Sequence, residues 1–278
     1  EISMLHINDF ILQAQQKGAS DLHIVCGLPI KCRLDGKMQT LSDTVPTPQD
    51  CEVLAQELAG AQFETIRESG ELDLALTADC GVRVRANIFH AGGALSFAIR
   101  LLNDVIPEIE DLDLPPTYPS GLVLITGETG SGKSTTLAAV LNRINHTACR
   151  HIITLEDPIE YIYTSDQCLI NQREIGRDTM SFAAGLRAAL REDPDVILVG
   201  EMRDYETISA ALLAAETGHL VLSTLHTTGA AQTVERIIDA CPTGSQNQIR
   251  IQLAAALKAQ VTLENKNVSI EEFNKMFE

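Results

Sequence analysis

The feature that most constrains the fold of this chain is a glycine-rich segment of the pattern G-x-x-x-x-G-K-[ST], found at Gly127-Glu128-Thr129-Gly130-Ser131-Gly132-Lys133-Ser134. An apolar run, Leu122–Thr126, precedes it directly, and a stretch with helical periodicity, Thr135–Ile144, follows it. In such a strand–loop–helix unit, successive backbone N–H groups point at phosphate oxygens and the helix N-terminus adds positive potential. A chance glycine and serine turn would lack these flanking elements. The segment therefore predicts a nucleotide-binding loop.

Two side chains of this loop have specific tasks in phosphate chemistry. Lys133 is expected to reach the β- and γ-phosphates, and the Ser134 hydroxyl is expected to ligate Mg²⁺. ATP and Mg²⁺ are therefore the expected cofactors. The residues expected to bind the nucleotide are Gly127, Glu128, Thr129, Gly130, Ser131, Gly132, Lys133, Ser134 and Thr135.

Strand and helix candidates alternate in the part of the chain that carries this loop. The strand candidates are Leu122–Thr126, Ile152–Leu155, Val196–Val199 and Leu220–Thr224, and the helical stretches are 133–145, 179–192, 204–216 and 230–239. This alternation predicts an α/β layer with a mainly parallel sheet. Beyond it, Asn247–Gln260 is predicted to be a helix, and a capping box at Ser269 and Glu272 predicts a short helix within Val261–Glu278.

The first part of the chain has a different pattern. Four of the ten prolines lie within Asn103–Ser120, a composition typical of a linker. Before it, helices are predicted at His6–Lys17 and from Pro48 to about Ala59, and strands at Leu22–Val25, Ile30–Leu34, Leu72–Leu76, Val82–Phe89 and Leu95–Leu101. The prediction is a small α+β domain over residues 1–102, a linker over 103–117 and the α/β nucleotide-binding domain over 118–278.

Carboxylates follow two of the apolar strands. Val196–Val199 leads to Glu201, which can orient or deprotonate an attacking water. Aspartate commonly stands just before such a glutamate as the outer partner of Mg²⁺, but Gly200 occupies that position here. The strand end Ile153–Glu160 is the candidate source of the missing carboxylate, through Glu156 or Glu160. The alternative for these acids is a solvated strand end.

Two histidines flank the next strand. His219 stands at the start of Leu220–Thr224, and His226 stands just past its end. The carboxyl edge of a parallel sheet is where α/β ligand sites lie, which favours His226 as a sensor of the γ-phosphate through a neutral imidazole. A structural role is the alternative for both histidines, and it is the stronger alternative for His219.

Three arginines occur close together in the first domain. Arg83 and Arg85 share one face of a strand because side chains alternate with period two, and Arg100 lies on the following strand. A guanidinium supplied to a γ-phosphate from a neighbouring subunit neutralises charge in the transition state. The alternative is a solvated basic stripe.

Charge and cysteine usage exclude several classes of function. Acidic residues outnumber basic ones by 38 to 21, for a net charge of −17, which disfavours nucleic-acid partners and anionic membrane surfaces. A RecA-like nucleic-acid translocase is therefore a weak alternative. No apolar stretch is long enough to predict a transmembrane segment. The seven cysteines are scattered, without C-x-x-C spacing, which is typical of reduced thiols in a cytoplasmic protein.

Four of these segments together resemble the secretion and pilus-motor ATPases. Residues 127–145, 153–162, 189–208 and 214–239 are similar to that family's Walker A, Asp box, Walker B and His box, in order and with family spacing. The N-terminal segment Gly18-Ala19-Ser20-Asp21-Leu22-His23 is similar to the type IV pilus retraction ATPases within it. The resemblance covers roughly residues 5–258.

The resemblance implies a RecA-like P-loop ATPase domain preceded by a PAS-like domain, assembled as a homo-hexamer with ATP bound between the domains. It implies a motor for pilus retraction and twitching motility that works with an inner-membrane platform protein, in the cytoplasm at the pilus base. The implied roles are Glu201 as catalytic glutamate, Glu156 and Glu160 as the Asp box, His219 and His226 as the His box, and Arg83, Arg85 and Arg100 as arginines that reach the nucleotide.

The alternatives within this family are the extension ATPase of pili and the ATPase of type II secretion. Those relatives usually carry additional N-terminal domains and a four-cysteine zinc site, neither of which is seen here. Three departures from the family pattern stand out. Glu128 replaces a common proline, Gly93 replaces a common arginine, and the strand and helical region after Ala259 are expected to be missing near Gln260–Val261.

Overall fold

The computed structural model describes residues 5–102, 106 and 120–263, and the chain divides into two compact units, residues 1–104 and 105–278. The predicted linker and the predicted helix after Val261 fall largely or wholly outside the described residues. Among the helices of the described residues, none is long and apolar enough to cross a membrane.

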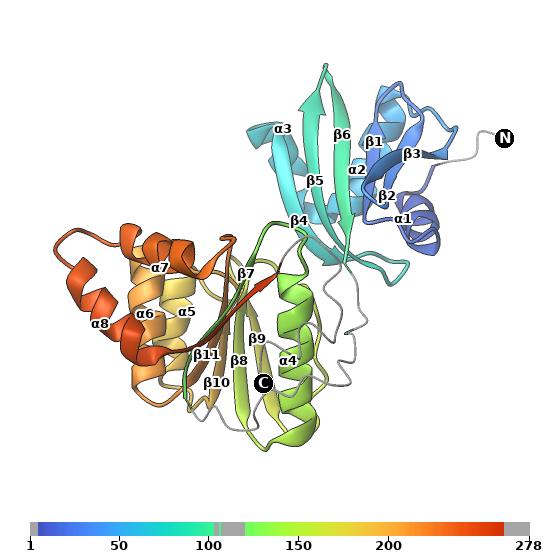
Figure 1. Ribbon diagram of the computed structural model, residues 1–278. Coiled ribbons are helices and arrows are strands. Elements are labelled where there is room, and N and C mark those ends of the chain that lie inside the picture. The colour runs from blue at the N-terminus through green and yellow to red at the C-terminus, as the bar shows by residue number, and fades with distance from the viewer. Residues whose placement is uncertain (1–4, 103–105, 107–119, 264–278) are drawn as a thin grey trace. The chain divides into compact units, whose positions relative to one another are not determined.

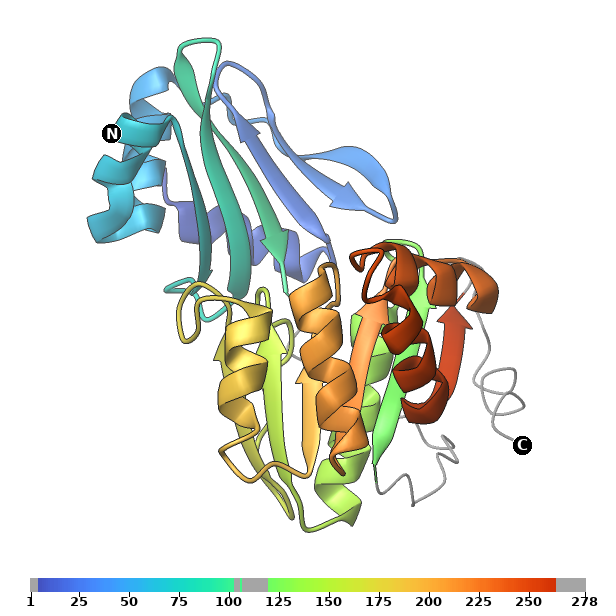
Figure 2. The same cartoon turned by 90° about the vertical axis from the view of Figure 1, so that its left-hand side faces the viewer.

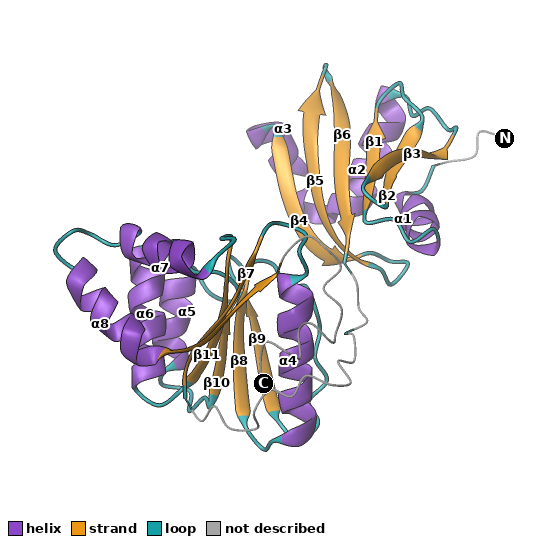
Figure 3. Cartoon of the chain, in the orientation of Figure 1, coloured by secondary structure: helices purple, strands orange, loops and turns teal. Residues whose placement is uncertain are grey.

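The first unit is an antiparallel sheet with helices on one face (Figure 3). Its helices are α1 (Ile7–Gln16), α2 (Pro48–Ala59) and α3 (Phe63–Ser69), with a short 3₁₀ turn at Gly60–Gln62. Its strands are β1 (Asp21–Val25), β2 (Ile30–Leu34), β3 (Lys37–Ser42), β4 (Glu71–Thr77), β5 (Arg83–Ala91) and β6 (Ala94–Leu101), in the order β3-β2-β1-β6-β5-β4. The predicted α+β character of this unit is confirmed.

Local chemistry explains how these elements begin and which face they bury. The Thr47 side chain accepts from the backbone N–H of Asp50, whose carboxylate accepts from the backbone N–H of Thr47, so α2 begins with a capping box. Along β5, Val84 and Ile88 are fully buried under the helices, while Arg85 points to the opposite face and is exposed. Burial of the apolar face is what holds the helices on the sheet.

The second unit is a parallel sheet with helices on both faces. Its strands are β7 (Gly121–Gly127), β8 (His151–Glu156), β9 (Leu169–Glu174), β10 (Val196–Val199), β11 (Leu220–Leu225) and β12 (Leu257–Leu263), in the order β12-β7-β11-β10-β8-β9. Its helices are α4 (Lys133–Thr147), α5 (Phe182–Ala189), α6 (Tyr205–Glu216), α7 (Ala230–Asp239) and α8 (Gln246–Ala256). Every strand pair is parallel, which confirms the α/β prediction.

Two apolar layers sandwich this sheet (Figures 1 and 2). Helix α4 packs on one face through Leu137 and Leu141. Helices α5 and α6 pack on the other face, and α8 packs against α6. Strands buried on both faces need continuous apolar sequence, and β10 consists of four buried aliphatic residues. The sheet is therefore a rigid platform for the loops at its ends.

The end of the sheet differs from the sequence-based expectation. The helix predicted over Asn247–Gln260 ends at Ala256, and the chain continues as β12, which pairs with β7. Val261 and Leu263 are buried because apolar and polar residues alternate from Leu257 onward, a strand pattern. A strand therefore runs through Ala259, whereas the absence of a further strand and helical region after it stays a prediction. The position expected to carry a gap lies within β12.

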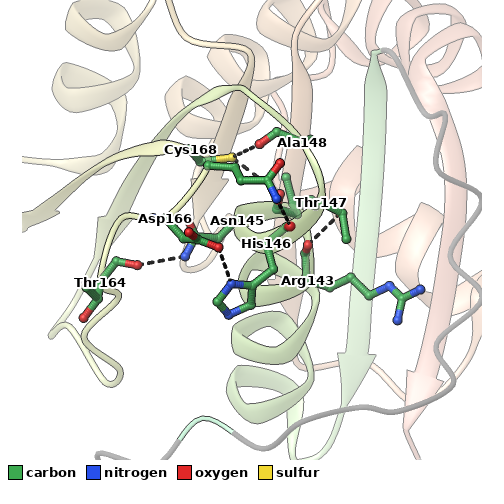
Figure 4. A network of polar contacts seen from close by, with 10 residues as sticks. Arg143, Asn145, His146, Thr147, Ala148, Thr164, Asp166 and Cys168 are labelled. Carbon is green, nitrogen blue, oxygen red and sulfur yellow. Dashed lines mark hydrogen bonds and ion pairs between the residues drawn. The ribbon is translucent and has the colours of Figure 1, made fainter.

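The far end of α4 is tied to the segment that leads into β9 (Figure 4). The fully buried Asn145 side chain donates from Nδ2 to the carbonyl of Thr164 at 2.8 Å and accepts at Oδ1 from the backbone N–H of Asp166 at 3.1 Å. Nδ1 of His146 lies 2.8 Å from a carboxylate oxygen of Asp166. These contacts fix the amino-terminal edge of the sheet, where β8 and β9 begin.

Candidate nucleotide-binding and hydrolysis site

The parallel sheet brings most of the predicted site residues to one edge. Register places Thr126 beside Leu225 and Leu155 beside Val199, so the carboxyl ends of β7, β8, β10 and β11 lie together. The predicted site residues at or just past these strand ends are Gly127, Glu156, Glu201 and His226. This is the edge at which open α/β sheets bind ligands.

The conformation of the glycine-rich loop requires its glycines. A Cβ on Gly127 would lie 2.5 Å from the carbonyl oxygen of Leu263 and 2.6 Å from Oγ of Ser131, closer than real Cβ atoms approach. Gly130 and Gly132 have φ angles of 81° and 92°, in the left-handed region that side chains disfavour. The loop thereby wraps tightly at the N-terminus of α4, with its backbone available for phosphate oxygens.

Lys133 lies at the centre of this loop. Its side chain is 7% exposed, and Nζ donates to the carbonyl oxygens of Gly127 at 2.8 Å and Glu128 at 2.7 Å. Burial lowers the pKa of Lys133, and the negative charge of Glu160 acts in the opposite direction. A cation held away from water by neutral carbonyls is suited to accept an anionic partner.

His226 lies against Lys133. Its Nδ1 is 3.4 Å from Lys133 Nζ and 3.5 Å from Oγ1 of Thr129, so Nδ1 is placed to accept. Loss of surrounding water and the positive charge of Lys133 both lower the pKa of His226, while Glu201 acts in the opposite direction. The imidazole is therefore neutral near pH 7, with an acceptor nitrogen facing the loop lysine.

Glu201 follows β10 after Gly200, whose backbone is hydrogen-bonded to both neighbouring strands. The backbone N–H of Gly200 donates to the carbonyl oxygen of Leu155 at 2.8 Å, and Thr224 Oγ1 donates to the Gly200 carbonyl oxygen at 2.6 Å. The Glu201 side chain is 20% exposed and lies 2.7 Å from Nε of Arg203. The sequence reasoning missed Arg203, although a basic residue two positions after a glutamate at a strand end is a visible signal.

Glu156 is held in a network of its own. Its Oε1 accepts from Thr154 Oγ1 at 2.7 Å and from Gln172 Nε2 at 3.2 Å. Burial raises the pKa of Glu156, these hydrogen bonds lower it, and the nearby charge of Glu160 raises it. Glu160 itself is exposed. The carboxylate of Glu156 is thus fixed in place, whereas Glu160 is at the surface.

Comparison with known proteins identifies the family. Residues 109–265, more than half of the chain, match the family described as Type II/IV secretion system protein.

The chain belongs to this family.

The chain is also similar to individual members over most of its length. It is 47% identical to the uncharacterized protein YggR of Escherichia coli K12, over 92% of this chain and 79% of that protein. It is 41% identical to the type IV pilus retraction ATPase PilT of Pseudomonas aeruginosa, over 93% of this chain and 77% of that protein. A crystal structure of the pilus retraction motor PilT with bound ADP superposes with a TM-score of 0.83, at 40% identity, covering 98% of this chain and 86% of that chain.

These matches confirm the resemblance drawn from the four motifs. The chain is a P-loop ATPase of the Type II/IV secretion family. As in the sequence expectation, the glycine-rich loop follows a parallel strand and opens a helix.

One predicted residue of this secretion-family ATPase is not brought to the loop. His219 stands at the amino end of β11, and its Nδ1 lies 2.9 Å from the carbonyl oxygen of Ala214 and 3.3 Å from Oγ1 of Thr217. A strand rises about 3.3 Å per residue, so the six residues of β11 separate His219 from His226 by roughly 20 Å. The contacts of His219 are those of a helix-end cap, not of a phosphate sensor.

The three predicted arginines gather on one face of the other unit. Arg85 and Arg100 stand directly opposite each other on β5 and β6. Arg85 pairs with Asp73 at 3.6 Å and Arg100 with Asp21 at 3.2 Å, and both guanidinium groups are largely exposed. Arg83 is half-buried two positions before Arg85 on the same face. Like charges at directly opposed positions repel, and the carboxylates of Asp73 and Asp21 offset that repulsion here.

Proposed function

We propose that this chain is a motor ATPase that retracts type IV pili, coupling ATP hydrolysis to the withdrawal of pilin. The observation that carries the proposal is the convergence of Lys133, Glu201 and His226 at one edge of the sheet, in a chain 41% identical to a named pilus retraction ATPase. A nucleotide there would contact a lysine, a carboxylate and a neutral imidazole at its terminal phosphate. Those groups suit an ATP hydrolysis that is coupled to a conformational change.

Each residue has a proposed task in hydrolysis. Lys133 leaves its two loop carbonyls for the β- and γ-phosphate oxygens, and Glu201 orients and deprotonates the attacking water. His226 accepts or donates one hydrogen bond that changes when the γ-phosphate leaves. Ser131 Oγ is buried with no hydrogen-bond partner in the described part of the chain, and a phosphate oxygen would satisfy it. The remaining proposed contacts to phosphate come from Gly127, Glu128, Thr129, Gly130, Gly132 and Thr135.

The oxygen donors at this edge fit Mg²⁺. The Ser134 hydroxyl lies in the first turn of α4, and Glu156 ends β8. In the described residues there is no group of three or more His, Cys, Asp or Glu side chains that could hold a metal by itself. Mg²⁺ is commonly held by one or two protein oxygens together with substrate phosphates, which matches this sparse set. Ser134 and Glu156 would hold Mg²⁺ together with the ATP phosphates, whose charge the ion would neutralise, and Glu160 would add negative potential nearby.

The proposed assembly is a homo-hexamer in which Arg83, Arg85 and Arg100 serve a nucleotide bound by a neighbouring protomer. Arg85 and Arg100 stand opposite each other on β5 and β6, and a phosphate would compete with Asp73 and Asp21 for their exposed guanidinium groups. We place the motor in the cytoplasm, at the inner face of the membrane, against a platform protein of the pilus base. Rotation of the two units about each other on hydrolysis would deliver the work.

Two substitutions test the loop lysine and the proposed general base, one through nucleotide binding and the other through turnover. Lys133→Ala should weaken binding of a fluorescent ATP analogue by about 100-fold or more, because the only loop cation is removed. Glu201→Gln should bind the analogue normally but lose about 100- to 1,000-fold in turnover, since general-base catalysis contributes that much. Glu235→Gln, an exposed glutamate on α7, is the matched control. Wild-type turnover in Glu201→Gln would refute the proposed site.

Sharing of the site between protomers is tested by mixing variants. Arg100→Ala protomers retain Glu201, and Glu201→Gln protomers retain Arg100, so mixed rings should recover part of the ATPase activity. A mixture of Lys133→Ala and Glu201→Gln protomers should recover none, because both changes affect the same protomer's loop edge. Equal activity in the two mixtures, at equal mixing measured by mass spectrometry, would contradict the proposed role of Arg100.

Direction of movement is tested in cells. Deletion of the gene should increase the number of surface pili and abolish twitching if the motor retracts them. Loss of all pili would assign the chain to extension instead. An unchanged pilus count together with a defect in protein secretion would assign it to type II secretion.

A further inference from the structure

Gln172 is a polar residue whose side chain is fully occupied beside the proposed site. It lies opposite Thr154 of β8 on β9, which is one of the two edge strands of the parallel sheet. Its Nε2 donates to Glu156 Oε1 at 3.2 Å and to the carbonyl oxygen of Tyr161 at 2.7 Å, and its Oε1 accepts from the backbone N–H of Tyr163 at 2.9 Å. Both donors of the amide are therefore used, and its carbonyl is used as well. These three hydrogen bonds fix the orientation of the Gln172 amide.

The segment after β8 depends on Gln172 for its position. Residues 159–165 form no strand, yet they run beside β9, because the Ser165 hydroxyl accepts from the backbone N–H of Ile170 and the backbone N–H of Ile159 donates to the Glu174 side chain. Gln172 bonds the backbone of Tyr161 and Tyr163 in this segment, and Glu174 accepts from the N–H of Ile159 at 3.2 Å. The Gln172 side chain thus makes the hydrogen bonds to this segment that the backbone of an edge strand would make to a further strand.

Tyr161 carries this connection to the nucleotide loop. Its side chain is 8% exposed, and its hydroxyl lies 2.9 Å from Oγ1 of Thr135, in the first turn of α4. One amide therefore touches Glu156 directly and reaches Thr135 through a single buried tyrosine. Hydrogen bonds through Gln172 and Tyr161 thus connect the strand-end carboxylate to the first turn of the loop helix.

We propose that Gln172 is a positioning residue for ATP hydrolysis, which fixes the Glu156 carboxylate relative to the first turn of the loop helix. The inference rests on the proposed function of Glu156 toward the Mg²⁺–ATP complex. A carboxylate that orients a metal complex must be held within a fraction of an ångström, and outer partners of such carboxylates commonly contribute that precision. Thr154 bonds the carboxylate from the same strand and the backbone of Glu160 bonds it from the segment that follows, so Gln172 supplies the contact from the neighbouring strand.

The test replaces Gln172 in two ways. Gln172→Leu removes every hydrogen bond, and Gln172→Glu keeps the size of the side chain but removes both donors. Each should lower kcat by about 10- to 100-fold, the usual effect of changing an outer partner of a metal-site ligand. The affinity for a fluorescent ADP analogue in EDTA should stay at the wild-type value, because the loop still holds the phosphates. Tyr161→Phe should give a smaller loss of kcat with the same pattern.

The matched control is Gln252→Leu. Gln252 Nε2 donates to Glu216 at 2.7 Å on the surface of α8 and α6, which reproduces the same amide-to-carboxylate contact outside the site. This variant should keep wild-type kcat. Melting temperatures of all variants report folding, and the isosteric Gln172→Glu keeps the test valid if Gln172→Leu unfolds.

A double-mutant cycle with Glu156→Gln distinguishes positioning from general damage. If Gln172 acts through Glu156, adding Gln172→Leu to Glu156→Gln should cause little further loss of kcat, because coupled residues are not additive. Losses that multiply, or wild-type kcat in both Gln172 variants while Glu156→Gln is inactive, would overturn the inference and leave the function of Glu156 intact. Wild-type kcat in Glu156→Gln would instead refute the function on which the inference rests.

Discussion

The two ends of the parallel sheet use the same residue types for different purposes, and β11 shows the contrast most directly. At its carboxyl end, His226 faces the side chains of Lys133 and Thr129. At its amino end, His219 bonds the carbonyl of Ala214 and the hydroxyl of Thr217. The first histidine has reactive neighbours, whereas the second completes the backbone of α6. Position along the strand, rather than residue type, decides which histidine lies against the nucleotide-binding loop.

The contrast follows from the direction of the helices. At the carboxyl edge the chain enters helices, whose N-termini present free N–H groups that attract anions. At the amino edge the chain leaves helices, whose last carbonyls need donors. His151 behaves like His219: its Nδ1 lies 3.0 Å from the Asp193 carbonyl oxygen and its Nε2 lies 2.8 Å from Asn171 Oδ1. Polar side chains at the amino edge are structural.

Asn145 tests the difference between the two edges of the sheet with the largest expected effect, a loss of stability. Asn145→Ala should lower the free energy of unfolding by about 3 kcal/mol, because a buried amide is lost and the Thr164 carbonyl and Asp166 N–H lose their partner. Binding of an ATP analogue should be unchanged. Urea denaturation and a binding titration measure the two quantities.

Asn142→Ala, on the same helix, controls for helix propensity and should cost little. If Asn145→Ala were no less stable than Asn142→Ala, or if it weakened nucleotide binding at full folding, the amino edge would not be purely structural and the comparison would fail.

Local sequence pattern was sufficient for much of this fold. The loop was predicted because its glycines and its flanking elements are contiguous. The start of α2 at Pro48 was predicted because Thr47 and proline mark it, and its predicted end, about Ala59, agrees with the structure. The carboxyl-edge position of His226 followed from strand direction alone. Strand β12 was missed because its alternation directly follows a helix without a turn residue between Ala256 and Leu257.

The contacts that organise the site could not be predicted in the same way. Gln172 lies on a polar edge strand that shows no apolar run, and its partners are 9 to 16 residues away along the chain. Tyr161 meets Thr135 only because that segment runs beside β9. Such contacts depend on register between strands, which no local window contains. The side chains that position a site are therefore harder to predict than those that react.

An intermediate effect is expected at the carboxyl edge, from His226. His226→Gln should lower kcat by about tenfold, equivalent to about 1.4 kcal/mol, because a hydrogen bond toward the terminal phosphate is altered. The unfolding free energy should change little, since the hydrogen-bond contacts of the imidazole, a hydroxyl and the loop lysine, are long, at 3.5 and 3.4 Å.

The pH dependence of kcat sharpens this prediction. The pKa of His226 is lowered, so the imidazole stays neutral as the pH falls through the range in which an ordinary histidine gains its proton. Activity should fall only at lower pH, when protonated His226 would face Lys133 with a like charge. His226→Gln should lack this decrease. An identical acid limb in both proteins would show that another group is responsible.

The smallest effect is expected at the opposite end of the same strand. His219→Gln should lower the free energy of unfolding by about 1 kcal/mol or less, because it removes one or two hydrogen bonds at the end of α6. Turnover should remain at the wild-type value, since roughly 20 Å of strand separates this residue from His226. Thr217→Val, which removes the neighbouring hydroxyl, should reproduce the stability loss without affecting kcat. A tenfold loss of kcat in folded His219→Gln that Thr217→Val does not share would contradict this expectation. It would mean that the two histidines at the ends of β11 are functionally coupled through the strand.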